Sequence, residues 1–119
     1  MRSYQYVADF EKLGFGLFVH FGLYSVQGEG EWYLAANVAP DRERYYKLVD
    51  KFVVAKNWAR DLVSTAKKAG CKYITLTTRH HDGFSLYDTC GLNTYDAPHS
   101  KCKRDLVKEF VDECNKHGI

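Results

Sequence analysis

The densest group of side chains able to do chemistry in this sequence lies within residues 77–84. Two adjacent imidazoles and a carboxylate, at His80, His81 and Asp82, follow an apolar run and then Thr77-Thr78-Arg79, and precede a glycine. A single histidine is more often a surface or core residue than a functional one. A packed core, however, has little use for His-His-Asp at three consecutive positions. We therefore interpret this group as part of a binding or catalytic site.

Two predicted strands would position these groups. Residues 72–77 are rich in aromatic and β-branched residues and predict a buried strand, while residues 14–22 form an apolar run bracketed by glycines that predicts a second, fully buried one. The second run carries His20 near its end. Functional groups of barrel and open α/β enzymes gather at the carboxyl ends of parallel strands. We therefore expect His20 to lie near the His80–His81 pair.

Two long loops are predicted, over residues 23–40 and 85–100, from their glycine, asparagine and proline residues. The first contains Glu31 and Trp32, a carboxylate beside an aromatic residue. Long structured loops in compact domains are often functional. A loop tryptophan that packs back onto the sheet is equally consistent with the sequence. The pattern leaves both readings open.

Apolar residues at helical spacing predict three helices. The first begins at Asp41 as N-cap, the second runs from Asn57 as N-cap to Gly70, and the third starts at about residue 101 or 104 and ends at Gly118. Residues 1–13 predict a short helical or irregular lead-in. The residues expected to face inward are Tyr45, Leu48, Val49 and Phe52 in the first helix, Trp58, Leu62, Val63 and Ala66 in the second, and Leu106, Val107, Phe110, Val111 and Cys114 in the third.

This order predicts an α/β fold built from parallel βαβ units. Two units do not make a complete parallel sheet with both faces covered, and Ile119 stands where a third strand would begin. We therefore expect residues 1–119 to be the N-terminal part of one larger barrel or open α/β domain. The sequence contains no repeat or linker that indicates a second domain.

Composition limits the partners and the location. The formal net charge of +2 among 119 residues argues against binding to nucleic acid or to an anionic membrane, and no apolar run approaches the length of a membrane span. The first residues contain no apolar signal segment, which predicts a cytoplasmic protein.

The four cysteines, Cys71, Cys90, Cys102 and Cys114, show no Cys-x-x-Cys spacing and are expected to be free structural thiols.

Three blocks of the chain carry a resemblance to a known family. Residues 16–26, residues 31–33 and residues 71–84 resemble the N-terminal catalytic domain of the α-L-fucosidases, glycoside hydrolase family 29, in the same order and at the same spacing. The similarity runs from about Phe10 to Ile119. One departure is Phe21, which stands where the family commonly has tryptophan.

The resemblance implies the N-terminal portion of a (β/α)8 TIM-like barrel, truncated after about two βα units. It implies retaining hydrolysis of terminal α-L-fucosyl linkages in glycans and glycoconjugates, without a cofactor. The residues that would bind fucose are His20, Glu31, Trp32, His80 and His81, with Glu31 also a candidate acid/base. Imidazoles both donate to and accept from hydroxyls, and an indole covers apolar patches of a sugar. The nucleophile of the family lies on a later strand, so the isolated chain is expected to be inactive.

Two alternatives remain open at this stage. A metal-dependent hydrolase could use His20, His80, His81 and Asp82 as ligands. Adjacent residues at a strand end point to opposite sides, which argues against both histidines reaching one metal ion. A non-catalytic carbohydrate-binding fragment is the other alternative. The expected partner is a fucosylated oligosaccharide or glycoconjugate, and the oligomeric state is open.

Overall fold

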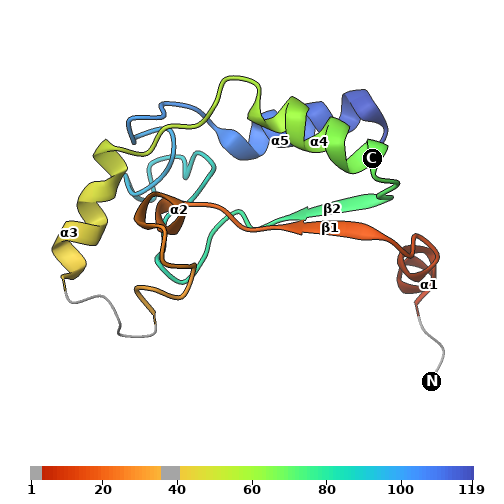
Figure 1. Ribbon diagram of the computed structural model, residues 1–119, viewed down its shortest axis with the longest axis horizontal. Helices are drawn as coiled ribbons and strands as arrows, with labels where there is room; N and C mark the ends of the chain where they lie inside the picture. Colours follow the sequence, from red (N-terminus) through yellow and green to blue (C-terminus); the bar gives the residue numbers. More distant parts are fainter. Residues whose placement is uncertain (1–3, 36–40) are drawn as a thin grey trace.

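The computed structural model describes residues 4–35 and 41–119. These residues form a small α/β unit (Figure 1). Its elements in chain order are α1 (Gln5–Glu11), β1 (Gly16–Val19), α2 (Leu23–Gln27), α3 (Arg42–Tyr46), the 3₁₀ helix η1 (Lys47–Asp50), α4 (Trp58–Lys68), β2 (Tyr73–Leu76) and α5 (Leu106–His117).

The two strands pair in parallel, as predicted. The register runs from Gly16 opposite Tyr73 to Val19 opposite Leu76, so the carboxyl ends of both strands meet at one edge. Gly16 is required by this packing, because a Cβ atom there would lie 2.3 Å from the ring of Tyr73. The pairing therefore brings the segments that follow Val19 and Leu76 together.

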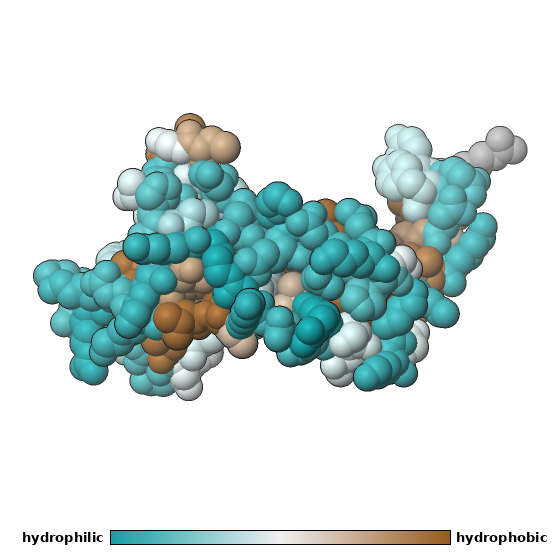
Figure 2. All heavy atoms as spheres, turned by 90° about the horizontal axis from the view of Figure 1, so that it is seen from above, coloured by the Kyte–Doolittle hydropathy of each residue, from teal (hydrophilic) through white to brown (hydrophobic). Residues whose placement is uncertain are grey.

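The predictions of a fully buried strand in residues 14–22 and a buried strand in residues 72–77 are wrong. Most residues of the two strands are half-buried, and the side chain of Phe18 is 66% exposed. Helices α4 and α5 lie along one face of the strand pair (Figure 1), and their outer surface is mainly hydrophilic (Figure 2). Alternate strand residues point to the opposite face, which the described residues do not cover around Phe18.

The main core lies beyond the carboxyl ends of the strands. Its buried members come from α2, α3, α5 and the connecting segments: Leu23, Leu34, Tyr45, Phe52, Phe84, Leu86, Ala97 and Leu106. Segment 85–100 was predicted to be a polar loop, yet it supplies two of these residues, and Ser85, Asp96 and Ser100 in it are also buried. Its backbone is held by bonds such as Leu86 N to Thr78 O, at 2.9 Å. This segment is part of the core.

The helix ends follow the predicted capping chemistry in part. Asp41 caps α3 by accepting a hydrogen bond from Arg44 N at 2.9 Å, and Gly70 and Gly118 follow α4 and α5 with positive φ. Asn57 stands at the N-cap of α4, but its side chain makes no capping bond. These glycines stop the helices because they adopt the left-handed conformation without a Cβ penalty.

Other element boundaries differ from prediction. Helix α2 lies in the predicted loop 23–40, whose residues 36–40 are outside the described residues, as are residues 1–3 of the lead-in. Helix α5 begins only at Leu106, because Asp105 accepts a bond from Lys108 N at 2.8 Å and caps it there. Val111 was predicted to face inward but is 46% exposed. The first helical segment tightens into η1 after Tyr46.

All four cysteines are free thiols, and Cys71 is buried as expected for a structural residue. Cys90, by contrast, is exposed. Across residues 4–35 and 41–119, no helix has the length and apolar character needed to cross a membrane.

Segment 85–100 contains a buried carboxylate that makes stability depend on pH. Asp96 is fully buried, and its oxygens lie 2.6 Å from His99 Nδ1 and 2.9 Å from Thr89 Oγ1. Burial alone would raise the pKa of Asp96, but the hydrogen bonds from His99 and Thr89 outweigh it and hold that pKa below its usual range. A lowered folded-state pKa stabilises the fold above the unfolded-state pKa, and that contribution is lost as pH falls through the folded-state value.

We therefore expect Asp96→Asn to destabilise the protein at neutral pH, with the deficit relative to wild type shrinking below about pH 4. Urea unfolding measured between neutral and acidic pH checks this. Asp61→Asn, which changes an exposed carboxylate on α4, is the control and should leave the pH profile nearly unchanged. A pH-independent deficit in Asp96→Asn would contradict the assignment.

Candidate functional site

Three predicted site residues meet at the carboxyl edge of the strand pair. His20 follows β1 directly, and His80 and His81 follow β2 after a short extension. The ring centroids of His20 and His80 are 5.3 Å apart, and those of His80 and His81 are 4.6 Å apart. The parallel register of β1 and β2 explains this proximity, because Val19 and Leu76 are paired.

Trp32 joins the histidines from a third segment. Its ring centroid lies 4.2 Å from that of His81 and 5.9 Å from that of His80, and 54% of the residue is exposed. The tryptophan therefore packs on the two imidazoles and keeps part of its surface open to solvent. We call His20, Trp32, His80 and His81 the histidine–tryptophan cluster.

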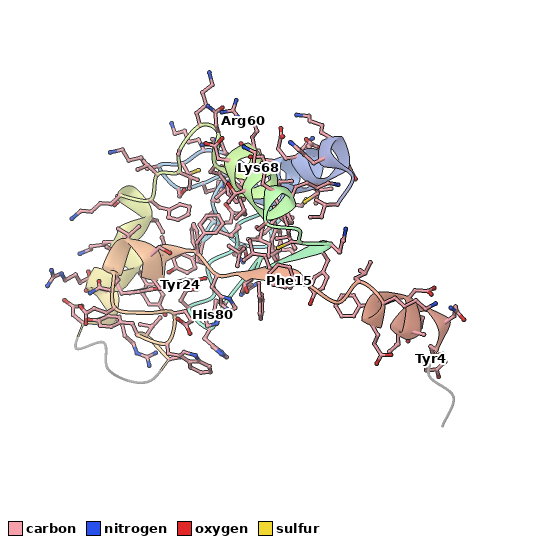
Figure 3. The ribbon with its side chains drawn as sticks, turned by 45° about the vertical axis from the view of Figure 1, so that its right-hand side comes forward. Tyr4, Phe15, Tyr24, Arg60, Lys68 and His80 are labelled. Atoms are coloured by element: carbon pink, nitrogen blue, oxygen red, sulfur yellow. The ribbon has the colours of Figure 1, made fainter. Side chains whose placement is uncertain are left out.

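Two further aromatic residues border this cluster and were not singled out from the sequence. Phe18 lies 4.5 Å from His20 and Tyr24 lies 5.5 Å from His80, measured between ring centroids. Figure 3 shows Tyr24 beside His80 near the ends of the strands. A Cβ atom on Gly22 would lie 2.9 Å from the ring of Tyr24, so this glycine makes room for it. Phe18 and Tyr24 both lie within residues 16–26, one of the blocks that carry the family resemblance.

Tyr24 is a buried phenol beside two carboxylates. Its hydroxyl has no hydrogen-bond partner among the described residues. Burial, and then the charges of Asp82 and Glu31, raise the pKa of Tyr24 to about 12. At neutral pH this phenol therefore keeps its proton and can act as a donor. Glu31 itself is half-buried and directly precedes Trp32 in the chain.

Asp82 does not face the cluster. Its side chain is buried, with one oxygen accepting from Tyr45 Oη at 2.7 Å and the other from Phe84 N at 3.1 Å. Gly83 N donates to His80 O at 3.0 Å and closes the turn. Asp82 therefore belongs to the turn.

The prediction that His80 and His81 point to opposite sides is wrong. Strand β2 ends at Leu76, so the alternation of a strand does not extend to these residues. The turn instead places their rings edge to face, with an interplanar angle of 81°. Within the described part of the chain, no three histidine, cysteine, aspartate or glutamate side chains are arranged to hold a metal ion.

The family model described as alpha-L-fucosidase matches residues 1–119, the whole chain. The chain belongs to the alpha-L-fucosidase family. Among the relatives of this fucosidase-family chain, the plasma alpha-L-fucosidase of Homo sapiens is 31% identical over 125 residues, covering 89% of this chain and 26% of the relative. The alpha-L-fucosidase of Dictyostelium discoideum is 31% identical over 131 residues, covering 92% and 28%. The chain thus spans about a quarter of the length of these relatives.

Solved fucosidase structures superpose on the chain. A bacterial fucosidase with a monovalent iminocyclitol inhibitor has a TM-score of 0.86 and 30% identity, covering 99% of this chain and 29% of that one. The alpha-fucosidase of Thermotoga maritima in complex with fucose has a TM-score of 0.80 and 30% identity, covering 92% and 32%. These relatives are glycoside hydrolases, and the α/β fold is shared.

The cluster has the chemistry to bind a polar ring. Each neutral imidazole offers one N–H donor and one acceptor nitrogen, and in this fucosidase-family chain the ring of His80 contacts those of both His20 and His81. The exposed part of Trp32 offers an aromatic surface at the same place. The arrangement can therefore hydrogen-bond several hydroxyls while covering an apolar patch.

Proposed function

We propose that this chain forms the fucose-recognition part of an α-L-fucosidase that acts on terminal α-L-fucosyl groups of glycans and glycoconjugates. The observation that carries the proposal is the histidine–tryptophan cluster. Three separate segments bring its rings together at the carboxyl edge of the strands, where each ring lies 4.2–5.9 Å from at least one other ring of the cluster. Membership of the family and a solved relative described in complex with fucose support the choice of sugar.

In this proposal the imidazoles of His20, His80 and His81 read the orientation of the fucose hydroxyls. Trp32 covers the apolar side of the ring, including the methyl group of a 6-deoxy sugar. His80 is half-buried, whereas His20 and His81 are exposed. The exposed pair is therefore available to a ligand without rearrangement of the core.

Hydrolysis with retention needs a carboxylate nucleophile and an acid/base carboxyl about 5–5.5 Å apart. We propose Glu31 as the candidate acid/base, because it directly precedes Trp32 of the cluster in the chain and is half-buried. We assign the nucleophile to a part of the family's catalytic domain outside residues 1–119. A covalent intermediate supports retention: a solved Bacteroides thetaiotaomicron relative is described as a trapped covalent intermediate with 2-fluoro-fucosyl fluoride.

We also propose that the strand pair and its helices belong to a (β/α)8 barrel. The parallel βαβ unit with helices on one face is the repeating element of such barrels. The solved relatives are about three times as long as this chain, since it covers 29% of the one with TM-score 0.86. The remaining βα units would cover the exposed strand face around Phe18.

The test is the stereochemistry of the reaction of the full-length protein with an aryl α-L-fucoside. Proton NMR of the first-formed fucose is expected to show the α-anomer, because two displacements restore the configuration. An aryl α-L-rhamnoside, another 6-deoxy sugar, is the control and should not be turned over. Inverted product would overturn the retaining assignment.

Two further outcomes separate the alternative functions. Activity that is abolished by a chelator and restored by zinc would favour a metal-dependent hydrolase. Fucose binding without turnover in the full-length protein would favour a carbohydrate-binding role.

A further inference from the structure

Tyr45 is placed where the two segments of the candidate site come together. It lies on α3 and is only 2% exposed. Its hydroxyl donates to Asp82 Oδ2 at 2.7 Å, and its ring stacks on that of Tyr33 with centroids 6.0 Å apart and an interplanar angle of 25°. One buried side chain therefore contacts residues that are 49 positions apart in the sequence.

Both contacts adjoin residues of the histidine–tryptophan cluster. Tyr33 directly follows Trp32, and Asp82 directly follows His81. The turn around Asp82 is short and closed, because Gly83 N donates to His80 O and Phe84 N donates to Asp82 Oδ1. A shift of the Asp82 carboxylate therefore moves both histidines, and a shift of Tyr33 moves Trp32.

Tyr45 is the buried phenol that bonds to Asp82 in the described structure. Asp82 is buried, so its carboxylate depends on hydrogen bonds from the protein in place of water. The hydroxyls of Tyr24 and Tyr95 are also buried near this carboxylate, yet neither has a hydrogen-bond partner among the described residues. Of these three phenols, only that of Tyr45 holds Asp82.

We propose that Tyr45 is a positioning residue for sugar recognition, which keeps Trp32 and the His80–His81 turn in their mutual arrangement through Tyr33 and Asp82. The effect of Tyr45 on catalysis rests on the proposed function, whereas its effect on the arrangement of the rings is independent of that function.

Tyr45→Phe and Tyr95→Phe form a matched pair that tests this role, because each removes one buried hydroxyl and keeps the ring. In the full-length protein, Tyr45→Phe is expected to lower kcat/KM for an aryl α-L-fucoside about tenfold to a hundredfold, the range for misplaced binding groups. Tyr95→Phe should change it less than about twofold, since no bond is lost. The double variant Tyr45→Phe with Asp82→Asn should lower kcat/KM no further than the more damaging single variant, because both substitutions act on the same hydrogen bond between Tyr45 and Asp82.

Selective labelling of histidine for NMR gives a second readout that does not depend on activity. The signals of His80 and His81 are expected to move in Tyr45→Phe and to stay in place in Tyr95→Phe. His117, at the end of α5, is the internal reference and should not move in either variant.

The outcomes separate this inference from the proposed function. If the His80 and His81 signals stay unchanged in Tyr45→Phe, or if that variant loses only thermal stability at wild-type kcat/KM, the positioning role is wrong. If the signals move but the wild-type protein neither binds nor turns over fucosides, the positioning role stands and the proposed function fails.

Discussion

Replacing His20 or His81 by alanine in the full-length protein is expected to lower kcat/KM for an aryl α-L-fucoside about tenfold to a hundredfold. Both residues are exposed at the carboxyl edge of the strands, and both contact His80. A hydrogen bond from either imidazole to a sugar hydroxyl can strengthen as the ring distorts toward its oxocarbenium-like transition state. Losing one such bond costs about 1–3 kcal/mol.

The same substitutions should barely change thermal stability, because exposed side chains contribute little to the core. Steady-state kinetics and thermal unfolding of each variant are the measurements. His117→Ala is the matched control, since His117 lies on α5 and outside the cluster. The site assignment is wrong if the His20 and His81 variants keep wild-type kcat/KM and lose stability.

Leu106→Ala is expected to lower the free energy of unfolding by about 2–5 kcal/mol. Leu106 is fully buried at the start of α5 and belongs to the core beyond the strand ends. Its N–H bond to Leu86 O, at 2.9 Å, is kept in the variant, so the loss reports the cavity left by the side chain. Urea unfolding followed by circular dichroism measures it.

Leu92→Ala is the matched control, because the same side chain is removed where it is 89% exposed. It should change the free energy of unfolding by less than about 0.5 kcal/mol. Equal losses in the two variants would mean that segment 85–106 does not form the core as described. The kinetics of folded Leu106→Ala molecules should stay close to wild type.

Residues of the candidate site and residues of the core are close neighbours in the chain. Asp82 and Phe84 are buried directly after the exposed His81, and Leu34 is buried two residues after the exposed Trp32. Each segment of the site is therefore anchored by a buried neighbour in the chain. This arrangement holds binding groups in place on loops, where functional residues of α/β enzymes gather.

Local chemistry was enough to predict much of this chain from its sequence. The apolar runs before His20 and Thr77 predicted the two strands and their parallel pairing, and Gly70 and Gly118 predicted where α4 and α5 stop. These features depend on backbone preferences and hydrophobic periodicity, which each segment carries by itself. The closeness of His20 to His80 follows from them, because paired parallel strands end at one edge.

Tertiary structure alone decided the rest. Parts of segment 85–100 are buried in spite of its polar composition, because the buried Asp96 is satisfied by His99 and Thr89 within the segment. The contact between His80 and His81 depends on a turn beyond the strand end, and Tyr45 reaches Asp82 across 37 positions. A hydrogen bond between distant residues is not predicted by any periodic pattern of residues in the sequence. It forms only because the folded chain brings a donor and an acceptor together away from water.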